Sequence, residues 1–130
     1  MIETPVQKVS LKGIFERDSK FLLVCEANGE WELPGGRLEL GEEIEAGFER
    51  EISEELGWTG RTMGKISHIC SKIGQNTGNQ YIVICAVVEA KTDPIVLSDE
   101  HVEYGWFVLA EIEKLNILPD YIIAIKKSSV

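Results

Sequence analysis

The first third of the chain alternates apolar runs with short polar turns, a pattern typical of β-strands. Residues 6–16 (VQKVSLKGIFE) mix alternating and β-branched positions, and residues 21–25 (FLLVC) are apolar throughout. The polar residues 18–20 between them indicate a turn, so the two segments predict a hairpin or two neighbouring strands. A shorter extended piece at 31–33 follows the turn dipeptide Asn28-Gly29.

The motif Pro34-Gly35-Gly36 stops this extended piece and predicts a loop. Two consecutive glycines allow positive φ and a close approach of the backbone to another group. We therefore expect this loop to lie against a ligand.

After the loop, the hydrophobic period becomes helical and predicts a helix that starts near Glu43 and ends at Gly57. Glycine commonly closes a helix just after its last turn. Apolar residues at i, i+4 spacing form the face that is expected to meet the core: Ile44, Phe48, Ile52 and Leu56.

The rest of the chain predicts further strands and two short helices in an irregular order. The strands are expected at 61–71, 81–90 and 104–108, and the helices at 109–116 and 121–127, with Pro119 just ahead of the last one. Because this order is not a regular β-α-β alternation, we expect an α/β sandwich around a mixed sheet, formed by a single domain of residues 1–130.

Composition narrows the class of protein. A chain of 130 residues that is 44% hydrophobic and 27% charged suits one globular domain with a buried core. Its apolar runs are far shorter than the roughly 20 residues that cross a bilayer, so no membrane span is expected. The net charge of −9 argues against nucleic-acid binding, which needs basic patches.

Cysteine usage and the N-terminal sequence predict a cytoplasmic protein. Cys25, Cys70 and Cys85 are odd in number, have no regular spacing and lie in or beside apolar runs. We therefore expect reduced, mostly buried thiols rather than a disulfide or a zinc site. The opening residues MIETPVQKVS lack both the basic and the apolar region of a secretion signal.

The negative charge is concentrated in residues 36–58, where eight glutamates stand against two arginines and contribute −6 of the net −9. On the predicted helix, Glu51, Glu54 and Glu55 stand at i, i+3 and i+4, which turns their carboxylates to one side. Like charges at that spacing repel, so the cluster favours a bound cation. A solvated acidic face is the alternative.

Two neighbouring residues fit a site of this kind. Gly47 lies on the carboxylate side one turn earlier, where its missing side chain would leave room for a phosphate or a metal-bound water. Arg50 flanks the cluster and is expected to hold one glutamate through a charge-assisted hydrogen bond.

Residues 36–58 resemble, position for position, the signature motif of Nudix hydrolases. Five residues separate Gly36 from Glu42, and seven more separate Glu42 from the rest of the motif, which is Arg50-Glu51, Ile52, Ser53, Glu54-Glu55, Leu56, Gly57 and Trp58. The motif covers under a fifth of the chain. Its position between two groups of predicted strands also looks like that family.

The resemblance implies a pyrophosphohydrolase that cleaves a nucleoside diphosphate linked to another moiety and that uses Mg²⁺ or Mn²⁺. It implies metal ligands from the helix and from a backbone carbonyl of the glycine loop: Glu51, Glu54, Glu55, and Gly35 or Gly36. Glu42 is implied to support the loop geometry or a second metal, and Arg50 to orient Glu51. Mg²⁺ prefers oxygen ligands of this kind, and bound ions of this type neutralise phosphate charge and activate water.

The family often places one more glutamate on a loop before a late strand, as a base or an additional ligand. Glu100 and Glu103 are the candidates here, and we prefer Glu100 because Glu103 lies nearer the strand expected at 104–108. His101 is expected to be exposed rather than to contact phosphate. The catalytic residues expected from the motif and this loop are Glu54, Glu55, Arg50 and Glu100.

Substrate choice rests on elimination. The sequence lacks the downstream motifs that the family associates with NADH, ADP-ribose or dinucleoside polyphosphate hydrolysis, which leaves a (d)NTP pyrophosphohydrolase as the default. A non-catalytic Nudix-fold module that binds a nucleotide or a protein partner is the alternative, and diphosphate isomerisation is a remote third. Family members are often dimers, so a homodimer is one expected state. The polar loop 73–80 is expected to be either a substrate-selecting lid or a hairpin connection.

Overall fold

A long first strand, β1 (Gln7–Arg17), organises the sheet. The computed structural model describes residues 4–129, so residues 1–3 and 130 of the expected domain lie outside the described residues. A two-residue turn with positive φ at Asp18 and Ser19 leads from β1 into the antiparallel β2 (Lys20–Cys25). Such turns match the twist of paired strands, and the predicted hairpin is confirmed.

The sheet is mixed, as expected. Its strand order is β3-β2-β1-β6-β5, and β1 runs parallel to β6 (Gln80–Val88) but antiparallel to β2. The remaining strands are all antiparallel to their named neighbours: β3 (Trp31–Glu32), β4 (Gly35–Arg37), β5 (Ile66–Ile73) and β7 (Glu103–Phe107). β4 pairs with β1, and β7 pairs with β2.

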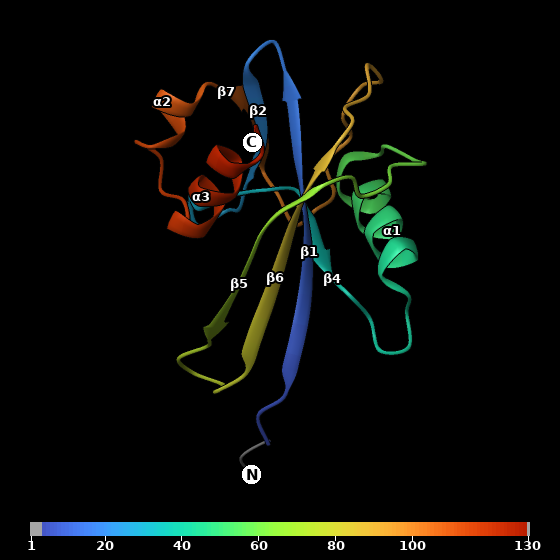
Figure 1. The fold of residues 1–130 in the computed structure, drawn as a ribbon, viewed down its shortest axis with the longest axis vertical. Helices are drawn as coiled ribbons and strands as arrows, with labels where there is room; N and C mark the ends of the chain where they lie inside the picture. The colour runs from blue at the N-terminus through green and yellow to red at the C-terminus, as the bar shows by residue number, and fades with distance from the viewer. Residues whose placement is uncertain (1–3, 130) are drawn as a thin grey trace.

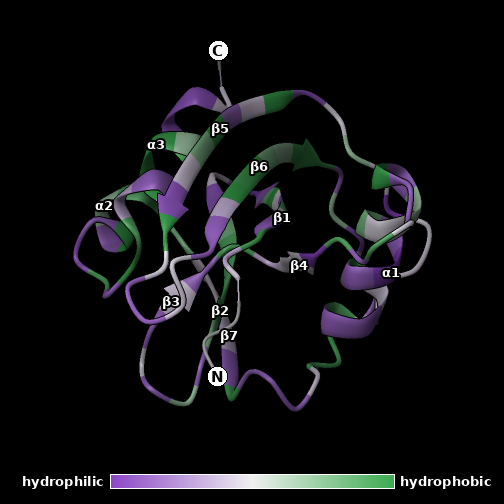
Figure 2. Ribbon diagram, turned by 90° about the horizontal axis from the view of Figure 1, so that it is seen from below, coloured by the Kyte–Doolittle hydropathy of each residue, from purple (hydrophilic) through white to green (hydrophobic). Residues whose placement is uncertain are grey.

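Helices lie on the two sides of this sheet, as Figures 1 and 2 show: α1 (Ile44–Leu56) on one side, α2 (Leu109–Ile112) and α3 (Pro119–Lys127) on the other. Pro119 occupies the first turn of α3, where its missing N–H costs no hydrogen bond. This arrangement confirms the α/β class. None of the helices within residues 4–129 has the length and apolar character needed to span a membrane.

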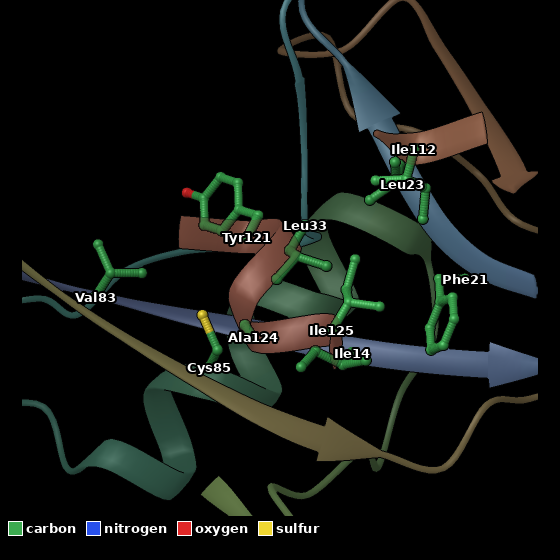
Figure 3. Close-up of a cluster of buried hydrophobic side chains, with 10 residues drawn as sticks. All are labelled: Ile14, Phe21, Leu23, Leu33, Val83, Cys85, Ile112, Tyr121, Ala124 and Ile125. Atoms are coloured by element: carbon green, nitrogen blue, oxygen red, sulfur yellow. The ribbon is translucent and has the colours of Figure 1, made fainter. Parts of the chain in front are cut away.

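Each side of the sheet has its own buried cluster. Under α1, the helix residues Phe48, Ile52 and Leu56 pack with Phe15 and Trp58, all fully buried. Under α3, a second cluster joins the helix to strands of the sheet, and Figure 3 shows its side chains. Each large apolar side chain that is buried in this way stabilises the fold by roughly 1.5–3 kcal/mol.

Several predicted boundaries were wrong for identifiable reasons. The strand expected at 61–71 starts later, as β5. The helix expected at 109–116 ends at Ile112 as α2, because the chain then turns toward β3, where the Trp31 N–H donates to the Asn116 carbonyl. Ile44, expected in the core, is 45% exposed because it lies in the first turn of α1, ahead of the buried cluster.

Candidate active site

Core packing fixes the rotation of α1. Its apolar stripe of Phe48, Ile52 and Leu56 is fully buried, so the neighbouring stripe of glutamates is held at the edge of the sheet. The helix ends at Gly57, as predicted, with φ of 72° and an N–H that donates to the Ser53 carbonyl at 3.0 Å.

The glycine pair brings the backbone against this stripe. A Cβ at Gly35, where φ is 140°, would overlap the Leu11 carbonyl, and a Cβ at Gly36 would overlap the Glu51 carboxylate. The pair was expected to form a loop, but Gly35–Arg37 is a short strand, β4, because it hydrogen-bonds to β1. Gly35 therefore permits a close approach to the backbone of β1, and Gly36 permits a close approach to Glu51.

Arg50 cross-links the acidic residues of the helix and its entry loop. Its Nε donates to Glu42 Oε2 at 2.6 Å, and its Nη1 donates to Glu51 Oε1 at 3.0 Å and to Glu54 Oε2 at 3.2 Å. The hydrogen bond from Arg50 lowers the pKa of Glu42 to about 2. Glu42 thus stays ionised and paired with Arg50 at neutral pH.

A cleft of about 440 Å³ opens beside β4 and the C-terminal half of α1. Its acidic wall includes Glu51, Glu54 and Glu100 together with the backbone of Gly35 and Gly36. The cleft is also lined by residues of β1, β3 and α3 and by the residue just after β2: Ser10, Lys12, Glu32, Tyr121 and Glu26. Glu100 therefore lines the same cleft as Glu51 and Glu54, whereas Glu103 is an exposed residue of β7 paired opposite Cys25.

Glu55 points away from solvent, into a buried polar network. It is 2% exposed, accepts a hydrogen bond from the Gly35 N–H at 3.3 Å, and burial raises its pKa to about 7. His101 lies between two carboxylates, with Nδ1 3.7 Å from Glu55 Oε1 and Nε2 3.0 Å from Glu32 Oε1. Lys12 reaches the same Glu32 oxygen at 3.4 Å.

This network corrects one expectation and adds residues that sequence reasoning missed. His101 was expected to be exposed, but it is 7% exposed because it fills the space between Glu32 and Glu55. Lys12 is 6% exposed, and it sits in a strand whose neighbours are apolar. A lysine inside the apolar strand segment 11–15 is the sequence signal for it, because a charge buried in such a strand needs a partner.

Gly47 has a different role from the one expected. A Cβ at this position would meet Leu38 Cδ1 at 2.6 Å and Glu42 Oε1 at 2.7 Å. The space beside Gly47 is therefore filled by the entry loop of α1 rather than left for a phosphate or water. The small residue lets Glu42 reach Arg50.

The charges of the cleft suit a divalent cation. The acidic side chains that line it (Glu26, Glu32, Glu51, Glu54 and Glu100) outnumber the basic ones (Lys12 and Arg37). Burial raises the pKa of Glu51, and the nearby carboxylates of Glu54 and Glu100 raise it further, against the opposing effect of Arg50. Carboxylates crowded in this way with backbone carbonyls at hand provide the oxygen donors that Mg²⁺ and Mn²⁺ prefer.

Comparison with known proteins places these features in a family. The NUDIX domain model matches residues 6–126. An "ADP-ribose pyrophosphatase" of Methanocaldococcus jannaschii is 30% identical over 122 residues, covering 87% of this chain and 72% of that protein. The "Nucleoside triphosphatase NudI" of Salmonella paratyphi B is 29% identical over 138 residues, covering 92% and 96%.

Two further matches are a relative that aligns over less than half of this chain and a solved structure. A "MutT-like protein" of Streptomyces ambofaciens is 49% identical over 55 residues, which is 41% of this chain and only 36% of that relative's length. The crystal structure of a MutT protein from Methanosarcina mazei superposes with a TM-score of 0.79 at 26% identity, covering 97% of this chain and 94% of the other.

Proposed function

Because the chain belongs to the Nudix family, we propose that it hydrolyses a nucleoside triphosphate to the monophosphate and pyrophosphate with Mg²⁺ or Mn²⁺. Family membership makes it a Nudix pyrophosphohydrolase; the substrate and the metal are the proposal. The observation that carries it is the cleft that Glu51, Glu54 and Glu100 line together with Gly35 and Gly36.

We assign the metal to the acidic wall of this cleft. Glu51 and Glu54 supply carboxylate oxygens, and a carbonyl of Gly35 or Gly36 adds a backbone oxygen. A bound divalent ion supplies positive charge to the phosphate oxygens and makes water a better nucleophile. Glu55 stays a predicted ligand on the buried side of the same wall.

The other side chains bind, orient and accept a proton. Lys12 and Arg37 line the cleft and offer positive charge to the phosphates. Glu100 accepts the proton of the attacking water, whose oxygen bonds to phosphorus as the bond to the bridging oxygen breaks and pyrophosphate leaves. Arg50 and Glu42 hold Glu51 and Glu54 in place, and a second-metal role for Glu42 stays a prediction.

The relatives and the cysteines support the finer parts of this proposal. The relative named a nucleoside triphosphatase matches over most of both chains, which favours a triphosphate, while the relative named an ADP-ribose pyrophosphatase supplies the competing substrate. Free Cys25, Cys70 and Cys85 suit the reducing cytoplasm.

The test is a panel of nucleoside triphosphates and ADP-ribose, assayed with and without Mg²⁺ for the nucleoside monophosphate that hydrolysis of either class of substrate releases. We expect triphosphates to be preferred, and the double variant Glu54→Gln, Glu55→Gln to lose on the order of a hundredfold or more in kcat/KM, as expected when charge-stabilising groups are removed. Glu49→Gln is the matched control, because Glu49 is an exposed glutamate of the same helix.

The outcomes separate the alternatives. Preference for ADP-ribose would overturn the substrate but keep the reaction class. Full turnover by the double variant would overturn the assigned site, and nucleotide binding without any turnover would favour the non-catalytic module.

A further inference from the structure

β5 exposes apolar side chains to solvent and turns polar side chains toward the protein, which is the reverse of an ordinary surface strand. Its outward residues Ile69 and Ile73 are 57% and 64% exposed. The alternate positions His68 and Cys70 are half-buried. β5 packs against α3, and Cys70 contacts the buried cluster that includes α3 side chains. A strand normally turns its apolar side inward, so polar donors under a helix need another explanation.

Three metal-ligating side chains meet at this place. His68 Nε2 lies 3.1 Å from Asp120 Oδ1. One ligand atom from each of the three residues lies within 4.8 Å of the others. The cluster contains none of the residues that line the cleft beside β4 and α1, here called the glutamate cleft.

We propose that His68, Cys70 and Asp120 bind a zinc ion, with water as the fourth ligand. Nitrogen, thiolate and carboxylate donors all serve zinc, whose bonds of about 2.0–2.3 Å place tetrahedral ligand atoms roughly 3.5 Å apart. Thiolate is a poor ligand for Mg²⁺, so the two sites select different metals.

The charge balance of the site is favourable. The Cys70 thiol releases its proton to solvent on binding, and the thiolate and the Asp120 carboxylate together neutralise Zn²⁺. Two lysines now occupy the surroundings: Lys127 Nζ lies 3.4 Å from His68 Nδ1, and Lys72 Nζ lies 3.8 Å from Asp120 Oδ2. Both ammonium groups lie at the ends of flexible stems, so the proposal requires them to move away from the entering ion.

The ion would tie α3 to the sheet. His68 and Cys70 belong to β5, whereas Asp120 lies in the first turn of α3. The next residue, Tyr121, lines the glutamate cleft. Zinc at this site would therefore restrain the helix turn that carries Tyr121 into the cleft.

Titration of the metal-free protein with Co²⁺, as a spectroscopic probe for zinc, tests this site. We expect one equivalent to produce thiolate-to-cobalt charge-transfer absorption in the near ultraviolet, and Zn²⁺ to displace it. Cys70→Ser should abolish the band, while Cys25→Ser and Cys85→Ala should keep it because their thiols lie outside the cluster. Glu51→Gln with Glu54→Gln should also keep it.

A second measurement guards against misfolding of Cys70→Ser. Zn²⁺ should raise the unfolding midpoint of the wild type, as any ligand of the folded state does, and should raise it less in His68→Gln and Asp120→Asn. Absence of the band in the wild type, its survival in folded Cys70→Ser, or Co²⁺ binding without thiolate absorption would overturn the proposal.

Discussion

At the scale of single residues, Arg50 shows why the motif contains an arginine and not simply a positive charge. Its guanidinium donates to carboxylates of Glu42, Glu51 and Glu54 and to the Arg37 carbonyl at the same time. A planar group with several fixed N–H donors can do this, whereas an ammonium on a flexible stem cannot. The positions of the proposed metal ligands therefore depend on one side chain that need not touch the substrate.

We accordingly expect Arg50→Lys to lower kcat/KM about ten- to a hundredfold, the range seen when groups that orient metal ligands are removed. The same substitution should raise the Mg²⁺ concentration needed for half-maximal rate, because Arg50 no longer holds Glu51 and Glu54 in position. Steady-state assays over a Mg²⁺ series measure both. Arg61→Lys is the control, since Arg61 lies outside the cleft-lining set and donates to the Glu89 carbonyl. An unchanged Mg²⁺ dependence in Arg50→Lys would contradict the positioning role.

At the scale of elements, α1 is held by its packed stripe and by its C-terminal cap. Gly57 ends the helix with φ of 72°, a conformation that costs L-residues with a side chain roughly 1–2 kcal/mol. Leu56, the last residue of α1, is fully buried beside this cap. The end of α1 and the rotation of its glutamates are thus set by the same turn.

Gly57→Ala should therefore lower the free energy of unfolding by about 1–2 kcal/mol. The added Cβ also comes within 3.2 Å of Val96 Cβ, which must shift. Urea denaturation measures the change, with Glu49→Ala as a control on the exposed face of the same helix. Equal stability of Gly57→Ala and the wild type would show that the cap carries no strain for alanine.

At the scale of the whole molecule, the cluster under α3 joins β6, β1 and the C-terminal helix, and it encloses a thiol. Burial raises the pKa of Cys85 from 9.0 to about 12. The folded state therefore keeps its proton in a pH range in which the unfolded chain has lost it. The contribution of protonated Cys85 to the free energy of unfolding is fully present below pH 9 and is lost as the pH rises toward 12.

The free energy of unfolding should fall by up to about 1.4 kcal/mol per pH unit through this range. Cys85→Ala should flatten that decline, even though the smaller side chain lowers stability at every pH. Urea denaturation at several pH values, with a chelator present, gives the two slopes. If the free energy of unfolding fell equally steeply with pH in Cys85→Ala and in the wild type, the assignment of the decline to Cys85 would be contradicted.

The sequence pattern predicted local helices, strands and turns, but it did not predict contacts between residues that are distant in the chain. The hairpin, α1 and its stop at Gly57 depend on period and turn chemistry within a few residues. The burial of His101 depends on Glu32, 69 residues away, and no local pattern contains that information. Gly47 was misjudged for the same reason, because its neighbour Leu38 belongs to a loop whose course was unknown.

The parallel pairing of β1 with β6 has a consequence for synthesis of the chain. Gln7 pairs with Gln80 and Phe15 with Val88. The central strand β1 therefore pairs with residues that are synthesised more than seventy positions later in the chain. Contacts between such distant segments form slowly, because a long loop must close first. The paired strands β1, β2 and β4 and the glutamate helix all leave the ribosome well before β6, so until β6 follows the sheet beside the helix lacks one of its central strands. We expect newly made chains to acquire metal affinity late, and all at once.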